Sequence, residues 1–259
     1  MTFSRNALTV VGLLFSTMGM AQDAANSTSE PGWSASASAG QVKTDLGTAQ
    51  EKSVTLRRYN ALGSIAVEQL SLKRFGYSDS AVALDAYPRL WSGAYANVRY
   101  QYASSPDLYP GKSWRAEVYQ NVGSGWELAA SHDALGFASP VNIEGVAVGK
   151  YWGNFYARWR HQRVTSAGSA GQGDRFMLRY YYEGDADHYV EANLSKGRSD
   201  DFSSALLAGS RSDSRGVAWY HFVTRQWVFK ASASQAHDSA AAAAGGTERS
   251  VTLGLAYRW

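Results

Sequence analysis

The sequence predicts an all-β fold, a transmembrane antiparallel up-and-down β-barrel of about fourteen strands. Three observations predict it: a secretory signal peptide, many segments in which apolar and polar side chains alternate, and connections whose length depends on their order in the chain. Each alternating segment has about ten residues, the length that a tilted strand needs to cross a bilayer. A closed barrel leaves no strand edge unpaired in lipid.

Residues 1–21 have the order of a secretory signal peptide. Arg5 supplies a positive charge, the apolar run ALTVVGLLF follows, and small residues precede the expected cleavage after Ala21. That run is shorter than the roughly 20 apolar residues of a membrane-spanning helix. We expect the mature chain to have a short periplasmic segment, residues 22–32, and one outer-membrane barrel domain, residues 33–259.

Composition excludes several classes of function. The chain has no cysteine, which leaves no disulfide framework, zinc site or thiol chemistry available. Its formal net charge of +3 and its lack of a Lys/Arg run argue against a nucleic-acid partner. Two adjacent carboxylates, Asp200 and Asp201, are a weak signal for calcium. We therefore expect no metal ion and no cofactor.

Alternation places the strands in chain order. The final segment, VTLGLAYRW, sets its large apolar residues on one face and Thr252, Gly254, Ala256 and Arg258 on the other. The segments SWRAEVYQNV, NFYARWRHQR, GDRFMLRYYYEG and RQWVFKASAS alternate in the same way, whereas the faces of 141–151 and 215–223 are ambiguous. The expected strands lie near 33–41, 50–59, 63–73, 79–88, 93–103, 112–122, 125–133, 140–151, 154–163, 173–183, 187–197, 213–223, 225–236 and 248–259.

The connections form two groups. The even-numbered ones are short: NALG, PRLWS, GS, WG, EGDAD and T. The odd-numbered ones are mostly longer, as in SSPDLYPG, TSAGSAGQG, GRSDDFSSALLAGSRS and HDSAAAAAGG, and the stretches SAGSAGQG and AAAAAGG are expected to be flexible surface loops. Short turns on one rim and long loops on the other are typical of outer-membrane barrels. A count of twelve strands is the alternative if the first hairpin lies outside the closed sheet.

Several stretches resemble the YaiO family of outer-membrane β-barrels. They are DAYPRLWSGAYANVRYQY (85–102), AEVYQNVGSGWELAAS (116–131), VAVGKYWGNFYARWR (146–160), LRYYYEGDADHYV (178–190) and SRGVAWYHFVTRQWVFKAS (214–232). The resemblance implies a place in the outer membrane of a Gram-negative bacterium, in contact with its lipid and lipopolysaccharide. It also implies a link to export or modification of surface polysaccharide.

The C-terminus suggests how the barrel closes. The last strand must pair with the first. Its ending, with Tyr257 and Trp259, resembles the signal that the barrel assembly machinery recognises in outer-membrane barrels. This machinery is therefore an expected partner.

With the apolar faces outward, charged and aromatic side chains point into the lumen, because Arg or Lys on the lipid face would cost about 2–4 kcal/mol. Simple hairpin registers set Arg158 opposite Arg179, Arg179 opposite Glu191, and Arg99 opposite Arg115 or Glu117. The candidate solute path is lined by Arg57, Arg99, Arg115, Glu117, Arg158, Arg160, Arg175, Arg179, Tyr181, Glu191 and Lys230.

These residues favour a channel or export component for a polar solute or exopolysaccharide. An Arg-rich lumen attracts anionic solutes or sugar acids, and tyrosines stack on sugar rings. The alternative is a lumen closed by interlocked side chains, in a barrel that is an enzyme or a structural membrane protein. His132–Asp133 and His237–Asp238 are the candidate catalytic pairs, but neighbours on a strand point to opposite faces, which favours a non-enzyme with no catalytic residue.

Overall fold

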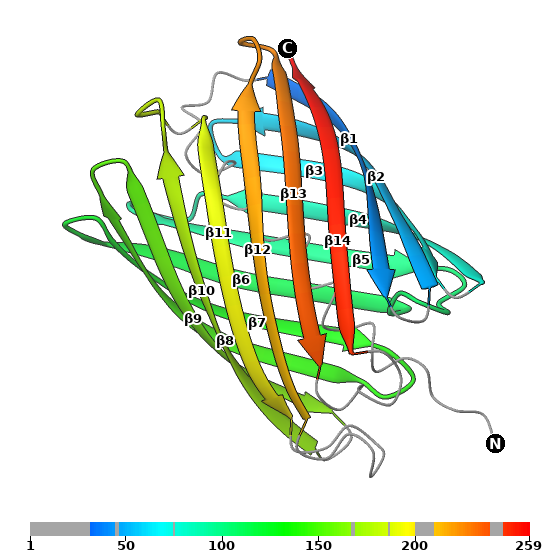
Figure 1. Ribbon diagram of the computed structural model, residues 1–259. Helices are drawn as coiled ribbons and strands as arrows, with labels where there is room; N and C mark the ends of the chain where they lie inside the picture. The colour runs from blue at the N-terminus through cyan, green and yellow to red at the C-terminus, as the bar shows by residue number, and fades with distance from the viewer. Residues whose placement is uncertain are drawn as a thin grey trace.

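The computed structural model describes residues 32–44, 47–74, 76–166, 169–185, 187–199, 210–238 and 246–259. These residues form a closed antiparallel barrel of fourteen strands, each paired with its neighbours in sequence, with β1 paired to β14 (Figure 1). The predicted fold class is therefore confirmed, with fourteen strands. The alternative of twelve strands is wrong, since β1 and β2 belong to the closed sheet. The expected signal peptide, residues 1–21, and most of the expected periplasmic segment 22–32 lie outside the described residues.

The strands lie close to their predicted positions. Their bounds are β1 Gly32–Thr44, β2 Gly47–Asn60, β3 Gly63–Arg74, β4 Tyr77–Pro88, β5 Ala94–Ala103, β6 Lys112–Gly123, β7 Trp126–Gly136, β8 Val141–Trp152, β9 Phe155–Ser166, β10 Ser169–Tyr181, β11 Tyr189–Ser199, β12 Ser210–Phe222, β13 Trp227–Asp238 and β14 Thr247–Arg258.

The two faces of the sheet differ as the alternation predicts. On β2, Val54 is 60% exposed on the outside, whereas Arg57 is 6% exposed on the inside. The same contrast recurs around the barrel, so that the outer surface is apolar and the buried interior holds charged and aromatic side chains. Within the described residues, no helix is long and apolar enough to span a membrane.

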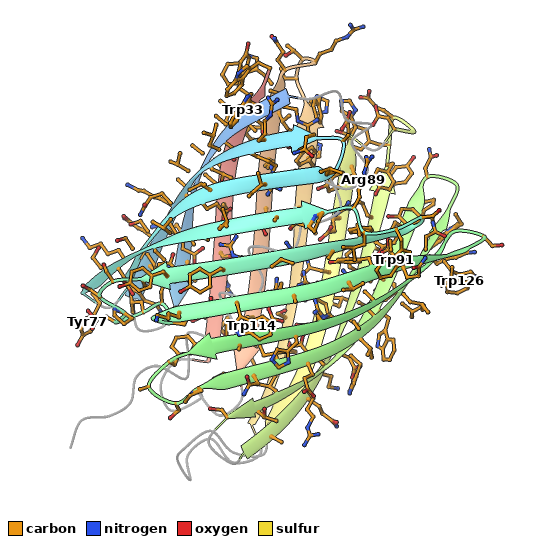
Figure 2. The ribbon with its side chains drawn as sticks, turned by 180° about the vertical axis from the view of Figure 1, so that it is seen from behind. Trp33, Tyr77, Arg89, Trp91, Trp114 and Trp126 are labelled. Atoms are coloured by element: carbon orange, nitrogen blue, oxygen red, sulfur yellow. The ribbon has the colours of Figure 1, made fainter. Side chains whose placement is uncertain are left out.

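Aromatic residues gather at the rims. Trp33, Trp91 and Trp126 are exposed at the rim that carries the even-numbered turns, and Tyr77 is exposed near the opposite rim (Figure 2). Outer-membrane barrels carry such aromatic girdles on both sides of an apolar band. The exterior therefore combines an apolar band with aromatic rims, which are the two features typical of a barrel in a lipid bilayer.

The even-numbered connections are short turns, and they define what we call the short-turn rim. They consist of residues 61–62, 89–93, 124–125, 153–154, 182–188 and 223–226. The turn between β6 and β7 depends on glycine: Gly125 has a φ of +76°, and a Cβ there would lie 2.6 Å from the carbonyl oxygen of Tyr151. Such a position is strained for any residue with a side chain.

The opposite rim departs from the prediction. The connections 45–46, 75–76 and 167–168 are as short as those of the short-turn rim, because the strands beside them are longer than expected. The stretch SAGSAGQG was predicted to be a flexible loop, which is wrong for Ser169–Gly173: these residues belong to β10 and pair with β9 through Ser169↔Ser166 and Gly173↔Gln162. A strand ladder uses backbone groups, so small residues can extend it. Most of AAAAAGG lies outside the described residues.

Strands β1 and β14 close the cylinder, as predicted. Their register runs from Ser34↔Arg258 to Thr44↔Glu248. At the rim, the amide of Trp33 donates to the carbonyl oxygen of Trp259 at 2.7 Å, and the amide of Trp259 donates to the carbonyl oxygen of Trp33 at 3.0 Å. The last residue of the chain is thus part of the seam.

Candidate functional site

The lumen has two unlike sides. One side, which we call the charged wall, is built from inward side chains of β2–β11: Arg57, Glu68, Asp85, Arg99, Arg115, Glu117, Asp133, Arg158, Arg160, Arg179 and Glu191. The other, the hydroxyl wall, comes from β12, β13, β14, β1 and β2 and consists of Ser36, Ser38, Ser53, Ser214, Ser232, Ser234, Ser250 and Thr252.

Ion pairs organise the charged wall. Arg57 Nη2 lies 2.9 Å from Asp85 Oδ2, and the same carboxylate group accepts a hydrogen bond from Asn97 at 2.7 Å. Further pairs join Arg99 to Glu68 and Arg115 to Asp133. Breaking one buried ion pair typically costs about 3–5 kcal/mol, because it leaves the other charge uncompensated. These cross-strand pairs therefore hold long side chains in fixed positions.

Glu117 is the centre of a second group of charges. Its carboxylate pairs with Arg158 and lies 3.6 Å from Arg160 Nη1. The inward face of β8 makes room for this group, since a Cβ on Gly145 would lie 3.0 Å from Arg160 Nε. A glycine is needed wherever a large side chain of the next strand lies over the backbone.

Tyrosines complete the charged wall near the short-turn rim. The hydroxyl groups of Tyr95 and Tyr156 donate to the carboxylate of Glu127 at 3.1 and 2.9 Å. The ring of Tyr95 stacks on Tyr119, with centroids 4.3 Å apart. Because these rings and carboxylates bind one another, this part of the barrel is filled.

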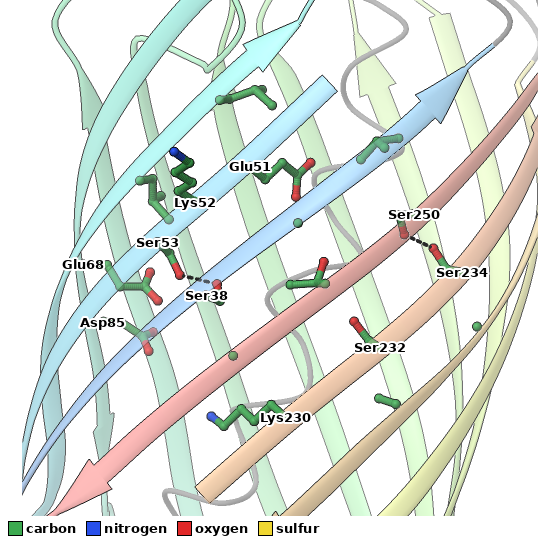
Figure 3. Close-up of a pocket in the computed structure, with 18 of the residues that line it drawn as sticks. Ser38, Glu51, Lys52, Ser53, Glu68, Asp85, Lys230, Ser232, Ser234 and Ser250 are labelled. Atoms are coloured by element: carbon green, nitrogen blue, oxygen red, sulfur yellow. Dashed lines mark hydrogen bonds between the residues drawn. The ribbon is translucent and has the colours of Figure 1, made fainter. Parts of the chain in front are cut away.

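The hydroxyl wall leaves space instead. Figure 3 shows its strands crossing in front of the charged wall, with short serine side chains between them. Ser38 Oγ lies 2.8 Å from Ser53 Oγ, and Ser234 Oγ lies 2.6 Å from Ser250 Oγ (Figure 3). Lys230 is the long inward side chain of β13 in this lining, and its Nζ lies 4.9 Å from the ring centroid of Tyr220.

A cavity of about 390 Å³ lies between the two walls. Its lining includes Ser38, Ser232, Lys230, Arg175 and Glu51. Small-molecule sites typically have about 300–1,000 Å³. Residues of both walls line it, with arginines such as Arg57 and Arg99 on one side and short serines on the other.

The connection between β5 and β6, residues 104–111, folds against the mouth of the lumen on the rim opposite the short turns. Asp79 Oδ2 accepts hydrogen bonds from the backbone amides of Leu108 at 3.1 Å and Tyr109 at 2.9 Å. Leu108 and Tyr109 are buried against Leu72 and neighbouring alanines. Tyr109 also lines the cavity. Asp79 thus holds this connection at one end of the cavity.

The structure places the residues of the predicted solute path in three ways. Arg57, Arg99, Arg115, Glu117, Arg158, Arg160, Arg179 and Glu191 belong to the charged wall. Arg175 and Lys230 line the cavity, as do Arg57, Arg99, Arg115 and Glu191 of the charged wall. Tyr181 is buried in a tyrosine cluster, with its ring centroid 5.8 Å from that of Tyr189.

The predicted registers are partly right. Arg179 faces Glu191, as predicted, and Arg99 faces Arg115, which was one of two predicted neighbours. Arg158 does not face Arg179, which is a correction: Arg158 faces Met177, and Arg179 faces Tyr156. The prediction centred the hairpin on a loop that is in fact mostly strand, so the register moved by two residues.

Sequence reasoning missed the hydroxyl wall and the Asp79 contact. The same period of two that found the inward arginines also puts Ser232, Ser234, Ser250 and Thr252 on the inner face. Charged and aromatic residues give a clearer signal of a lumen face than these small residues do. Nothing in the local sequence identifies the connection 104–111 as a partner of Asp79.

The predicted pair His132–Asp133 is separated, as expected for neighbours on a strand. The ring of His132 lies 4.9 Å from that of Trp114 on the outer face, while Asp133 points inward to Arg115. His237 Nδ1 lies 3.3 Å from Thr247 Oγ1. Asp200 and Asp201 lie outside the described residues.

One histidine at the short-turn rim has a shifted pKa. Partial burial acts to lower the pKa of His188, but its hydrogen bonds to Asp185 and to the backbone of Phe222 outweigh that effect and raise the pKa above its usual value. Asp185 also accepts hydrogen bonds from the amides of Asp187 and His188, and its pKa is lowered. Each partner of this pair thus favours the charged form of the other.

The C-terminal residues lie at the barrel seam. The ring centroids of Tyr257 and Trp259 are 5.8 Å apart, and Tyr257 packs on Trp227 at 4.8 Å. Trp259 is exposed on the outer surface of the short-turn rim.

Comparison with protein families gives a match to a membrane barrel domain. Residues 33–202 match the YaiO membrane beta barrel domain. A comparison with curated protein sequences gives no match.

Solved structures share the barrel fold. The COG4313 outer membrane channel from Pseudomonas putida F1 is 10% identical, with a TM-score of 0.59 over 90% of this chain and 97% of that one. A bacterial polysaccharide outer membrane secretin is 7% identical, with a TM-score of 0.59 over 88% and 98%. Omp33 of Acinetobacter baumannii is 12% identical, with a TM-score of 0.53 over 88% and 99%. At these identities the likeness shows the fold.

Proposed function

Because the chain belongs to the YaiO family of membrane β-barrel domains, we propose that it is an outer-membrane channel for a polar, hydroxyl-rich solute such as a saccharide. The carrying observation is the cavity beside the hydroxyl wall, inside a closed barrel with an apolar exterior. A saccharide segment that belongs to an exported polysaccharide is the solute class we favour.

The chemistry of the hydroxyl wall supports a solute with many hydroxyl groups. Each serine hydroxyl can donate one hydrogen bond and accept two. A solute that enters can therefore exchange hydrogen bonds with water for hydrogen bonds with this wall, at little net change in free energy. Selectivity in pores follows from such lining groups and from the pore diameter.

The charged wall supports passage in a different way. Its arginines are paired with carboxylates, as in Arg57–Asp85 and Arg179–Glu191. Paired charges bind one another in preference to a solute. The small residues of the hydroxyl wall therefore face the open side of the lumen. Lys230 and Arg175 line the same cavity together with Glu51 and Glu248, so charges of both signs face a polar solute there.

The test is conductance of the refolded mature chain in a planar lipid bilayer. Ser232→Trp places an indole in the lumen and should reduce single-channel conductance to about half or less, since the path narrows. Ala233→Trp is the matched control: Ala233 faces Val217 and Val251 on the apolar outer surface, and its variant should conduct like the wild type.

A second measurement tests the solute class. Proteoliposomes containing the protein should swell in neutral oligosaccharide and in uronic-acid oligosaccharide solutions, and Ser232→Trp should slow both. A wild-type protein that stays silent across a range of salts and voltages and gives no swelling would refute the channel. That result would favour the closed barrel with an enzymatic or structural role.

A further inference from the structure

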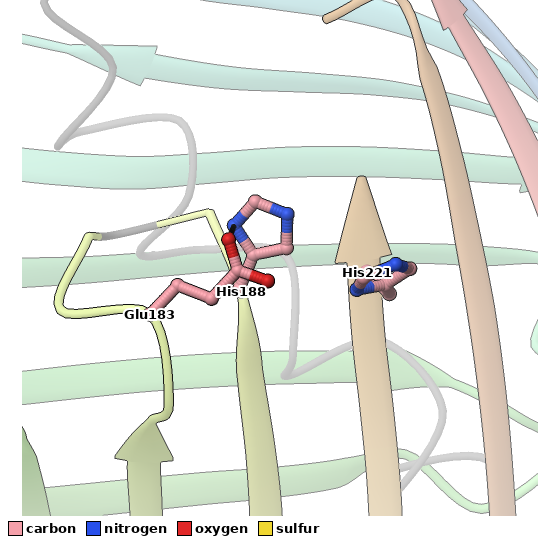
Figure 4. Close-up of side chains that lie close together, drawn as sticks. All are labelled: Glu183, His188 and His221. Carbon is pink, nitrogen blue, oxygen red and sulfur yellow. Dashed lines mark ion pairs between the residues drawn. The ribbon is translucent and has the colours of Figure 1, made fainter. Parts of the chain in front are cut away.

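The short-turn rim carries a cluster of metal-ligating side chains outside the lumen. Glu183 and His188 belong to the connection between β10 and β11, and His221 lies near the end of β12 (Figure 4). One ligand atom from each of the three lies within 4.8 Å of the other two. Among the described residues, this is the one group of three or more such side chains.

Two carboxylates converge on one nitrogen of His188. Its Nδ1 lies 2.9 Å from Asp185 Oδ2 and 3.6 Å from Glu183 Oε2. Its other nitrogen, Nε2, lies 3.3 Å from the carbonyl oxygen of Phe222. A metal-bound histidine commonly donates its second N–H to a carbonyl in this way, which fixes the ring and its tautomer. Nδ1 now forms a hydrogen bond with Asp185, so a cation would bind at Nδ1 by displacing the proton of that bond.

The second imidazole is also held in place. His221 Nδ1 lies 2.7 Å from the hydroxyl of Tyr182, which in turn accepts a hydrogen bond from Trp219 Nε1 at 3.0 Å. The rings of His188 and His221 meet edge to face, with centroids 5.1 Å apart. The Tyr182 hydroxyl can donate or accept, so it satisfies either tautomer of His221.

We propose that Glu183, His188 and His221 bind one divalent transition-metal ion of the zinc class on the short-turn rim. Two imidazoles and one carboxylate are a ligand set that zinc accepts, with water in the fourth position. The absence of cysteine excludes thiolate sites only. Around zinc, with bonds of about 2.0–2.2 Å, ligand atoms lie about 3.3 Å apart, so the three ligand atoms, which lie within 4.8 Å of one another, need to approach by about 1.5 Å at most.

The bound ion would add a further link to the hydrogen bonds that already join this connection to β12. It would connect residues 182–188, the longest connection of the short-turn rim, to the end of β12. Binding to the folded barrel alone stabilises it by mass action. The site lies at the rim and outside the cavity lining, so it acts on this rim independently of the channel.

The test is calorimetric titration of the folded mature chain with ZnCl₂ in detergent, after removal of metal with a chelator. We expect one zinc ion per chain. His188→Ala and His221→Ala should each weaken binding by about 100-fold or abolish it, since each removes a ligand, and Tyr182→Phe should weaken binding by about tenfold. The absorption spectrum with Co²⁺ should show bands of a low-symmetry nitrogen and oxygen site, which the same substitutions remove.

His161→Ala is the matched control. His161 Nδ1 lies 3.0 Å from Asp174 Oδ1, an exposed histidine–carboxylate pair outside the three-residue cluster. This variant should bind zinc as the wild type does. Heat-modifiable migration in gels verifies that every variant is folded. Wild-type protein that takes up no zinc, or folded His188→Ala and His221→Ala variants that bind it equally well, would overturn the proposal.

Discussion

Arg179 shows how a single charge is accommodated inside this barrel. It is 1% exposed, its guanidinium binds Glu191 at 2.9 Å, and it lies 4.0 Å from the ring centroid of Tyr189. Burying a charge is tolerated when it is paired and hydrogen-bonded. The sequence suggested Arg179 as a solute contact, but in the structure its guanidinium mainly binds neighbouring side chains.

Glu191→Ala should lower the free energy of unfolding by about 3–5 kcal/mol, because it leaves the buried Arg179 guanidinium without its carboxylate. The measurement is urea unfolding in phospholipid vesicles, followed by tryptophan fluorescence. Asp174→Ala is the control: this side chain is exposed, and its pair with His161 should contribute about 0–1 kcal/mol. Equal effects of the two substitutions would contradict the structural role of the pair.

Alternation predicts where the strands lie, and the turns set the register in which they pair. Strand β14 alternates cleanly and pairs with β1 as expected. In contrast, the β9–β10 hairpin has the connection 167–168, two residues shifted in register from the prediction, because Ser169–Gly173 extend the ladder. The small residues there indicated a flexible loop. The backbone of β9 nevertheless offers hydrogen-bond partners to Ser169–Gly173, and short side chains do not obstruct this pairing.

Deletion of Trp259 tests the C-terminal strand. We expect less folded barrel in the outer membrane, because the deletion removes two backbone hydrogen bonds to Trp33 and the aromatic end of the proposed assembly signal. The readout is the heat-modifiable fraction in isolated membranes. Trp259→Phe keeps both features and should assemble like the wild type. Full assembly of the deletion variant would show that the terminal residue is dispensable.

At the scale of the whole molecule, the barrel is asymmetric inside. The charged wall fills one side, the hydroxyl wall leaves a cavity on the other, and the connection 104–111 lies at one mouth. The cavity arises from the combination of strands that lie far apart in sequence, since β1 and β2 meet β12–β14 only when the sheet closes.

Asp79→Ala should increase single-channel conductance and its fluctuations, because it releases the amides of Leu108 and Tyr109 and lets the connection leave the mouth. The measurement is conductance in a planar bilayer. Asp107→Ala removes the same charge from an exposed position of the same connection and should leave conductance unchanged. A rise in conductance in both variants would show that the lost charge causes the effect, and not the loss of the hydrogen bonds that hold the connection.

The sequence by itself determined the fold class, the approximate positions of the strands and the face on which Val54 or Arg57 lies, because a period of two is a local property and lipid imposes it on every strand. The tertiary structure alone decided which carboxylate each arginine meets, where the lumen stays open and that Glu183, His188 and His221 lie together. Those features depend on register and on closure, which join residues that no local pattern relates.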